Sequence, residues 1–232
     1  VVISINHRFS YMGFLSTGDE NAPGNQGLKD IRLALEWVQQ NIKKFGGDPD
    51  QVTIFGHSSG STAVDYMIIS DSTKGLFHGA ILQSGSSLMT CLFQEDPRTQ
   101  AENLGHRLNL TFSDTKELIE KLREVDIEDI IEAESHLFTQ GDPWGLRTFE
   151  FVPCVEPKDT KNAFLTETPI ERLVDGNFHK VPIMMGSPNF EGMFISLFFQ
   201  AVPTILNHFN ENPSFIVPYT FGLQGDDAKI EE

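Results

Sequence analysis

Apolar segments of two different periods alternate along the first 85 residues, and this alternation limits the possible fold more than any other feature. Short apolar runs at residues 51–55 and 77–82 are typical of strands, whereas residues 62–70 have helical character. The clearest helix precedes them, since one face repeats an apolar side chain at spacings of three and four: Leu28, Ile31, Leu35, Val38, Ile42 and Phe45. Strands that alternate with helices favour a mostly parallel sheet with crossover helices, so the sequence predicts an α/β fold.

Three further apolar segments extend this pattern toward both ends of the chain. Residues 1–5 are predicted to form a buried strand and residues 181–186 a core strand, and residues 193–206 are apolar with helical character up to Pro203. Because the chain opens directly on a core strand, we expect a fragment that is incomplete at both termini.

The middle of the chain has a different organisation. Several short helices are expected over residues 97–135, with N-caps at Asp114 and Asp126. We interpret residues 97–150 as a helical insertion within a single partial domain that spans residues 1–232.

Composition excludes several classes of protein. The chain has 17 basic and 33 acidic side chains, and a net charge of −16 repels nucleic acid and anionic lipid. No run of 18 apolar residues occurs, so no membrane span is expected. Cys91 and Cys154 are too few for a disulfide framework or a four-ligand zinc site, and we expect both to be free. The sequence leaves cytoplasmic and secreted locations both open and gives no indication of oligomeric state.

One motif carries a specific chemistry. Gly56-His57-Ser58-Ser59-Gly60 has the pattern G-x-S-x-G, which forms a sharp turn that lifts a serine hydroxyl above a sheet edge. It lies between a predicted strand and a predicted helix, as such a turn requires. Both glycines are expected to be necessary, because a Cβ would collide with the adjacent helix and strand. We therefore predict that Ser58 is a nucleophile, the alternative being a Gly/Ser-rich loop without chemistry.

The motifs together resemble type-B carboxylesterases, the carboxylesterase/cholinesterase family of α/β-hydrolases, and are similar to insect α-esterases. The resemblance covers essentially the whole chain and implies an α/β-hydrolase fold. Beside the serine motif it is carried by Ser4-Ile5-Asn6-His7-Arg8, Gly24-Asn25-Gln26-Gly27-Leu28-Lys29-Asp30, Phe45-Gly46-Gly47-Asp48-Pro49, Lys74-Gly75-Leu76-Phe77, Gln83-Ser84-Gly85, Phe151-Val152-Pro153-Cys154-Val155-Glu156-Pro157 and Pro182-Ile183-Met184-Met185-Gly186.

The resemblance implies a Ser-Glu-His triad in that chain order. Ser58 takes the place of the nucleophile, and Glu191, just past the strand that ends at Gly186, takes that of the acid. The catalytic histidine is not expected in this chain, since His208 lies too early to match it. The backbone N–H of Ser59 is the implied oxyanion-hole donor, and its glycine partners would lie upstream of Val1. We therefore expect the fragment itself to be inactive.

The resemblance also suggests residues that contact substrate. His57 precedes the nucleophile and is expected to line the site without acting as its base. Phe149 and Phe151 occupy the stretch that resembles the acyl-pocket loop, where they would favour a small acyl group. They could equally be core residues. Ser84 is expected to be structural.

The predicted function is hydrolysis of small or lipophilic carboxylic esters, through an acyl-enzyme that water then cleaves. The resemblance suggests xenobiotic esters, hence detoxification, or lipid-derived esters, and it implies neither metal nor cofactor. A non-catalytic binding or adhesion protein and an ester-sequestering protein are the alternatives. Asn109-Leu110-Thr111 is a glycosylation sequon, whereas proline blocks Asn212-Pro213-Ser214.

Overall fold

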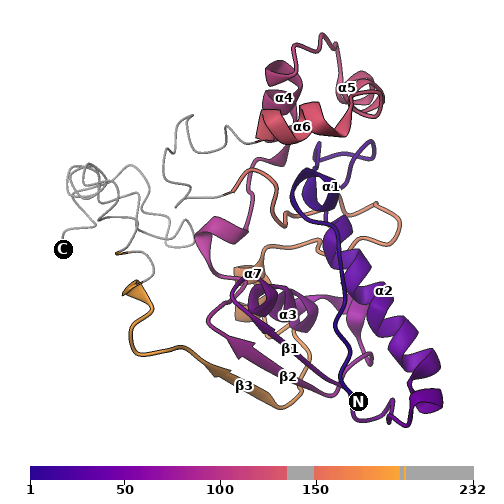
Figure 1. Cartoon of the computed structure of the whole chain (residues 1–232), viewed down its shortest axis with the longest axis vertical. Helices are drawn as coiled ribbons and strands as arrows, with labels where there is room; N and C mark the ends of the chain where they lie inside the picture. Colours follow the sequence, from indigo (N-terminus) through magenta and orange to yellow (C-terminus); the bar gives the residue numbers. More distant parts are fainter. Residues whose placement is uncertain (135–148, 194–195, 197–232) are drawn as a thin grey trace.

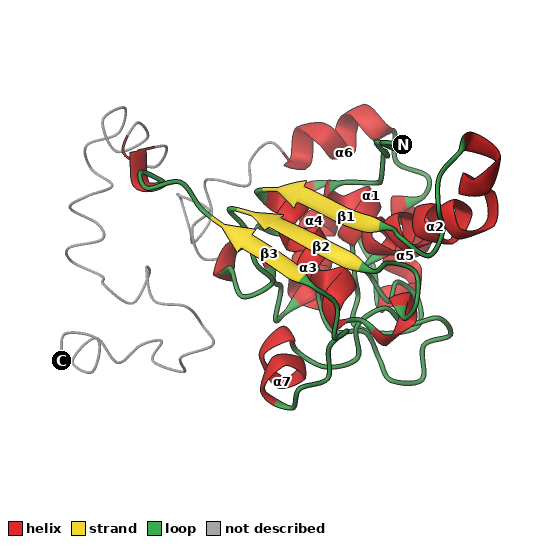
Figure 2. Cartoon of the chain, turned by 90° about the horizontal axis from the view of Figure 1, so that it is seen from below, coloured by secondary structure: helices red, strands yellow, loops and turns green. Residues whose placement is uncertain are grey.

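The computed structural model describes residues 1–134, 149–193 and 196 of the chain. Three described strands form one parallel sheet in the order β1-β2-β3, with β1 at Thr53–His57, β2 at Gly79–Gln83 and β3 at Ile183–Gly186. The register aligns His57 with Gln83 and Gln83 with Gly186, so the carboxyl ends of the strands meet at one edge (Figure 2). The predicted α/β architecture with a parallel sheet is confirmed.

Two long helices support the sheet. Helix α3 (Ser59–Ile69) leads from β1 to β2 and packs against both strands. Helix α2 (Gln26–Asn41), which continues into the 3-10 helix η1 (Ile42–Phe45), packs against α3 (Figure 1). Both helices contribute to one apolar core with β2 and residues 164–165. The predicted helices at residues 28–45 and 62–70 are therefore confirmed, although each begins two or three residues earlier.

A second group of helices lies at the opposite end of the molecule from the sheet (Figure 1). It consists of α4 (Pro97–Arg107), α5 (Thr115–Leu122) and α6 (Ile127–Glu134). The cap predicted at Asp114 is confirmed, because its carboxylate accepts the Glu117 N–H at 2.8 Å. These helices bury their apolar faces in a separate core that includes Phe151 and packs against α1 (Ser10–Phe14).

The remaining described elements are short: η2 (Asp71–Thr73), η3 (Thr90–Leu92) and α7 (Pro169–Val174). Helix α7 is held to the end of α3 by a buried arginine, since Arg172 donates from Nε to the Ile69 carbonyl at 3.0 Å. The same guanidinium pairs with Asp71 at 2.7 Å, which lowers the pKa of that carboxyl group.

A buried carboxylate joins segments that are far apart in the sequence. Glu156 has no exposed side-chain surface, and its Oε2 accepts from Lys29 Nζ at 2.5 Å. Its Oε1 accepts from Asn25 Nδ2 at 2.9 Å and from the Phe164 N–H at 2.8 Å. Asn25 in turn exchanges two hydrogen bonds with the backbone of Cys154. The turn before α2 is thereby fixed to residues 154–164.

The predicted strand at residues 1–5 is wrong for this structure. These residues are extended and exposed, with Val1 at 77% and Val2 at 81% exposure, and they belong to no strand. They border a cavity of about 480 Å³ that α2, β1 and α3 complete. A run of apolar residues becomes a buried strand only where a neighbouring strand accepts its hydrogen bonds, and no described residue does so for this run.

The strand predicted at residues 181–186 is present as β3, but it is not a core strand. All four of its residues are exposed, including Met184 at 68% and Met185 at 66%. It is one of the two outer strands of the described sheet, and its apolar side chains are open to solvent. Of the helical segment predicted at residues 193–206, all but two residues lie outside the described part, as do residues 135–148 of the predicted insertion.

We expect Lys29→Met to lower the free energy of unfolding by about 3 to 5 kcal/mol, because it leaves the buried Glu156 carboxylate without its cation. Chemical denaturation of the purified protein measures this loss. Arg98→Met is the matched control, since the Arg98–Glu102 pair is solvent-exposed and such pairs contribute little to stability. Equal losses in the two variants would contradict the structural role given to Glu156.

Candidate active site

Ser58 occupies the sharp turn between β1 and α3. Its backbone has φ 55° and ψ −123°, a strained conformation for a residue with a Cβ. The turn is held from both sides, because the Ser58 N–H donates to the Gln83 carbonyl at 2.9 Å and its own carbonyl accepts the Thr62 N–H at 3.0 Å. The side chain is exposed. This is the geometry in which a serine hydroxyl is presented above a sheet edge.

Two glycines allow the chain to pack tightly around Ser58. A Cβ on Gly56 would lie 2.2 Å from the Gly60 carbonyl oxygen, and one on Gly85 would lie 2.2 Å from that of Ser58. The prediction for Gly60 is wrong in this structure, since a Cβ there would meet no atom within 4 Å. Gly60 borders the cavity beside residues 1–5, which explains the open space.

The loop after β2 is fastened to α3 by polar side chains. Asp65 Oδ2, on a residue only 8% exposed, accepts from the Ser87 N–H at 2.7 Å, Ser87 Oγ at 2.8 Å and Ser86 Oγ at 3.1 Å. Ser61 Oγ donates to the Gly85 carbonyl at 2.8 Å. These bonds hold the loop directly beneath the turn that carries Ser58.

The sequence analysis did not identify Asp65, Ser61 or Gly85 as site residues. A signal for Asp65 exists in the sequence, because it is the only charged residue in the apolar stretch 63–69. A charge on a buried helix face requires hydrogen-bond donors nearby. Which donors they are depends on the return of the chain through β2.

Ser59 is the first residue of α3, and no side chain caps this end of the helix. The N–H groups of a first helical turn have no acceptor inside the helix, and the helix dipole adds positive potential there. The Ser59 N–H therefore suits the predicted role of donor to an oxyanion beside Ser58.

Glu191 lies five residues beyond β3, in the turn at residues 189–191, and it is exposed. The ends of β1 and β3 flank the end of β2. They are therefore about 10 Å apart, given a spacing of about 4.8 Å between neighbouring strands. Ser58 and Glu191 thus both follow strands that end at the same sheet edge. In a triad the imidazole lies between the serine and the acid and hydrogen-bonds to both. His208 lies outside the described residues.

The three residues predicted to contact substrate differ in their surroundings. His57 ends β1 and is exposed beside Ser58. Phe149 is 38% exposed, and its N–H donates to the Cys91 carbonyl at 3.1 Å. Phe151 is buried at 5% exposure in the core of the second helical group, where its ring meets Tyr11 edge-on. This placement favours the core alternative for Phe151.

The described residues also bear on three other features of the chain, namely metal ligands, cysteines and membrane spans. Residues 1–134, 149–193 and 196 contain no cluster of three or more His, Cys, Asp or Glu side chains that could hold a metal. Both cysteines are free as predicted, and burial raises the pKa of Cys154 to about 12. No helix in the described ranges is long and apolar enough to span a membrane.

A parallel sheet with an exposed serine on a strained strand-to-helix turn defines the α/β-hydrolase class. The crystal structure of juvenile hormone esterase from Manduca sexta, with OTFP covalently attached, matches this chain with a TM-score of 0.84 and 30% identity. The match covers 97% of this chain and 42% of that one. The model of the carboxylesterase family matches residues 1–220. The chain therefore belongs to the carboxylesterase family, and the resemblance seen in its motifs is confirmed.

Similar proteins include cholinesterases and insect esterases. Cholinesterase 1 of Branchiostoma lanceolatum is 39% identical over 198 residues, which cover 84% of this chain and 54% of that protein. Esterase FE4 of Myzus persicae is 35% identical over 236 residues, covering all of this chain and 40% of that protein. The chain thus spans about half, or less, of the length of these relatives.

We expect Gly56→Ala to lower the free energy of unfolding by about 3 kcal/mol or more, because its Cβ would collide with the Gly60 carbonyl. Gly60→Ala adds the same methyl group into open space within α3 and should be neutral or stabilising by about 1 kcal/mol at most, because alanine favours a helix more than glycine does. Chemical denaturation of both variants gives the comparison. A larger loss for Gly60→Ala would contradict the packing described around Ser58.

Asp65→Ala should destabilise the protein by about 2 kcal/mol, since it leaves the Ser87 N–H buried without an acceptor. Asp65→Asn keeps one carbonyl acceptor and should lose less. Hydrogen exchange at the Ser87 amide, measured by NMR, is expected to accelerate in Asp65→Ala far more than in Asp65→Asn. Unchanged exchange in both variants would show that Asp65 does not hold this loop.

Proposed function

We propose that the protein produced from the complete reading frame hydrolyses carboxylic esters through an acyl-enzyme formed on Ser58. The observation that carries this proposal is the conformation of Ser58, exposed and strained at the carboxyl end of β1. Strain of this kind persists where the surrounding structure compensates for it, and it is frequent at catalytic sites. Membership of the carboxylesterase family supports the same assignment.

In the proposed reaction Ser58 Oγ attacks the ester carbonyl and an alkoxide develops on the carbonyl oxygen. The Ser59 N–H stabilises that charge from the start of α3. The alcohol then leaves, and water cleaves the acyl-serine bond. Juvenile hormone esterase, whose structure matches this chain, carries a covalently attached compound, and this supports covalent chemistry in the shared fold.

Glu191 is proposed to accept the N–H of the catalytic imidazole and to stabilise the imidazolium that forms when Ser58 loses its proton. No histidine follows Glu191 within the described residues, and His208 is proposed not to be the base. Since a serine without a base is not activated, we expect residues 1–232 alone to show little or no turnover.

The substrates proposed are small or lipophilic carboxylic esters that are uncharged or cationic. A net charge of −16 disfavours the approach of strongly anionic substrates. Xenobiotic esters, as in detoxification, and lipid-derived esters are the two classes to compare in an assay. His57 and Phe149 are proposed to contact the substrate beside Ser58.

The product of the complete reading frame should react covalently with a fluorophosphonate probe at Ser58, and mass spectrometry of the labelled peptide identifies the site. Ser58→Ala is expected to abolish labelling, because it removes the attacking oxygen. Ser84→Ala is the control, since Ser84 lies at the end of the neighbouring strand and should remain dispensable for labelling.

The same experiment separates the alternatives. Labelling that persists in Ser58→Ala, or that is absent from the unsubstituted protein, would contradict the esterase proposal and favour a non-catalytic binding protein. A burst of one product per protein molecule without further turnover would indicate an ester-sequestering protein. Continuous release of alcohol and acid is the expected result.

A further inference from the structure

The turn that follows helix α4 contains the single Asn-X-Thr sequence of the chain. Asn109 has the left-handed backbone conformation, with φ 56°, which asparagine tolerates better than most residues. Its N–H donates to the His106 carbonyl at 2.9 Å, and the next N–H, of Leu110, donates to the Gly105 carbonyl at 2.9 Å. The turn is thus tied back onto the last residues of α4.

Side chains alternate between the core and the surface along this turn. Leu108, Leu110 and Phe112 are partly buried and pack against the core of the second helical group. Asn109 and Thr111, which lie between them, are exposed. The amide of Asn109 and the hydroxyl-bearing side chain of Thr111 therefore both lie on the outside, while the intervening leucine anchors the backbone.

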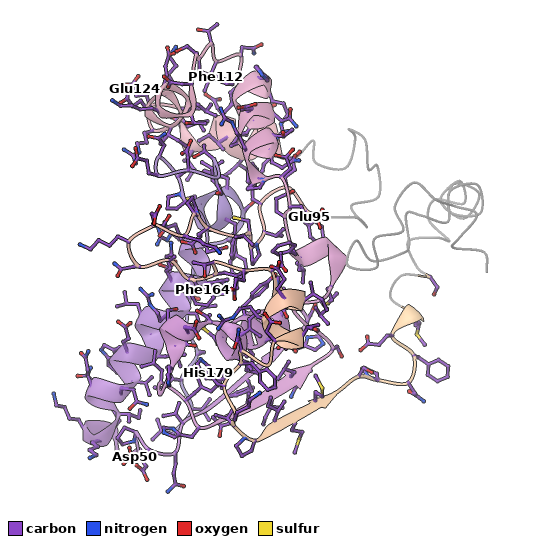
Figure 3. The ribbon with its side chains drawn as sticks, turned by 180° about the vertical axis from the view of Figure 1, so that it is seen from behind. Asp50, Glu95, Phe112, Glu124, Phe164 and His179 are labelled. Carbon is purple, nitrogen blue, oxygen red and sulfur yellow. The ribbon has the colours of Figure 1, made fainter. Side chains whose placement is uncertain are left out.

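The location is remote from the proposed active site. Figure 3 shows Phe112 at the end of the molecule opposite Asp50, within the group formed by α4, α5 and α6. Helix α3, which begins directly after Ser58, lies instead beside the sheet, away from that group (Figure 1). A large hydrophilic substituent on Asn109 would therefore extend from the helical group and not from the sheet that leads to Ser58.

We propose that Asn109 is an acceptor for an N-linked glycan and that the protein passes through the lumen of the endoplasmic reticulum, where the glycan is attached. The donor is an oligosaccharide linked to a lipid pyrophosphate. Asn109 Nδ2 forms a bond to C1 of the first sugar and loses one proton. The bond between C1 and the pyrophosphate oxygen breaks, and the lipid pyrophosphate leaves with the electron pair. The sequence Asn109-Leu110-Thr111 is the acceptor pattern that this transfer requires.

The experiment uses the product of the complete reading frame, both isolated from its natural source and expressed in insect cells. Treatment with peptide N-glycosidase F in heavy-oxygen water should increase electrophoretic mobility and leave a heavy-oxygen aspartate at position 109. The peptide that contains Asn212 is an internal negative control, because proline occupies the middle of its sequence.

Thr111→Val and Thr111→Ser form a matched pair. Valine has nearly the shape of threonine without its hydroxyl, so Thr111→Val should lose the mobility shift entirely. Thr111→Ser keeps an acceptor sequence and should retain the shift at least in part. Fluorophosphonate labelling should be equal in both variants, since the proposal does not depend on ester hydrolysis.

Three results would overturn the proposal. The natural protein could carry no heavy-oxygen label at position 109 after the enzymatic treatment. Thr111→Val could retain the full mobility shift, which would place the glycan elsewhere. Thr111→Ser could lose the shift while its unfolding transition stays unchanged, which would separate the modification from the acceptor sequence.

Discussion

The rest of this structure depends on one constraint, which is the direct contact between backbone segments at the Ser58 turn. Gly56 lies against the Gly60 carbonyl, and Gly85 lies against the Ser58 carbonyl, at positions where a Cβ would overlap with oxygen. This close approach brings β1, α3 and the loop after β2 together within one turn. It also holds Ser58 in a backbone conformation that is unfavourable for an isolated serine. The surrounding hydrogen bonds offset the free energy of that strain.

Buried carboxylates extend this arrangement away from the serine. Asp65 fastens the loop after β2 to α3, and Glu156 joins the turn before α2 to a segment more than a hundred residues later. Each carboxylate is satisfied by several donors, as a buried charge requires. The two apolar cores are connected as well, because Phe14 packs against both. The sheet that carries the site and the helical group near Asn109 therefore share one supporting framework.

The sequence predicts those site residues whose conformation is determined by a short local motif. Ser58 and Ser59 follow from a turn of five residues and from its position between a strand and a helix. Glu191 was assigned only through family resemblance, since a loop carboxylate has no local pattern that distinguishes it. Asp65 and Gly85 were not predicted as site residues, because the loop after β2 and the elements it contacts are more than twenty residues apart in the sequence.

The sequence by itself determined that the described strands alternate with helices in a parallel α/β fold, because the period of apolar residues distinguishes helix from strand locally. It also determined the serine turn, the Asp114 cap and the free state of both cysteines. Only the tertiary structure decided that residues 1–5 and β3 are exposed, that Phe151 is a core residue, and that Gly60 borders open space. The physical reason is that burial depends on which segments lie on either side of an element, and the apolar period of that element carries no information about those neighbours.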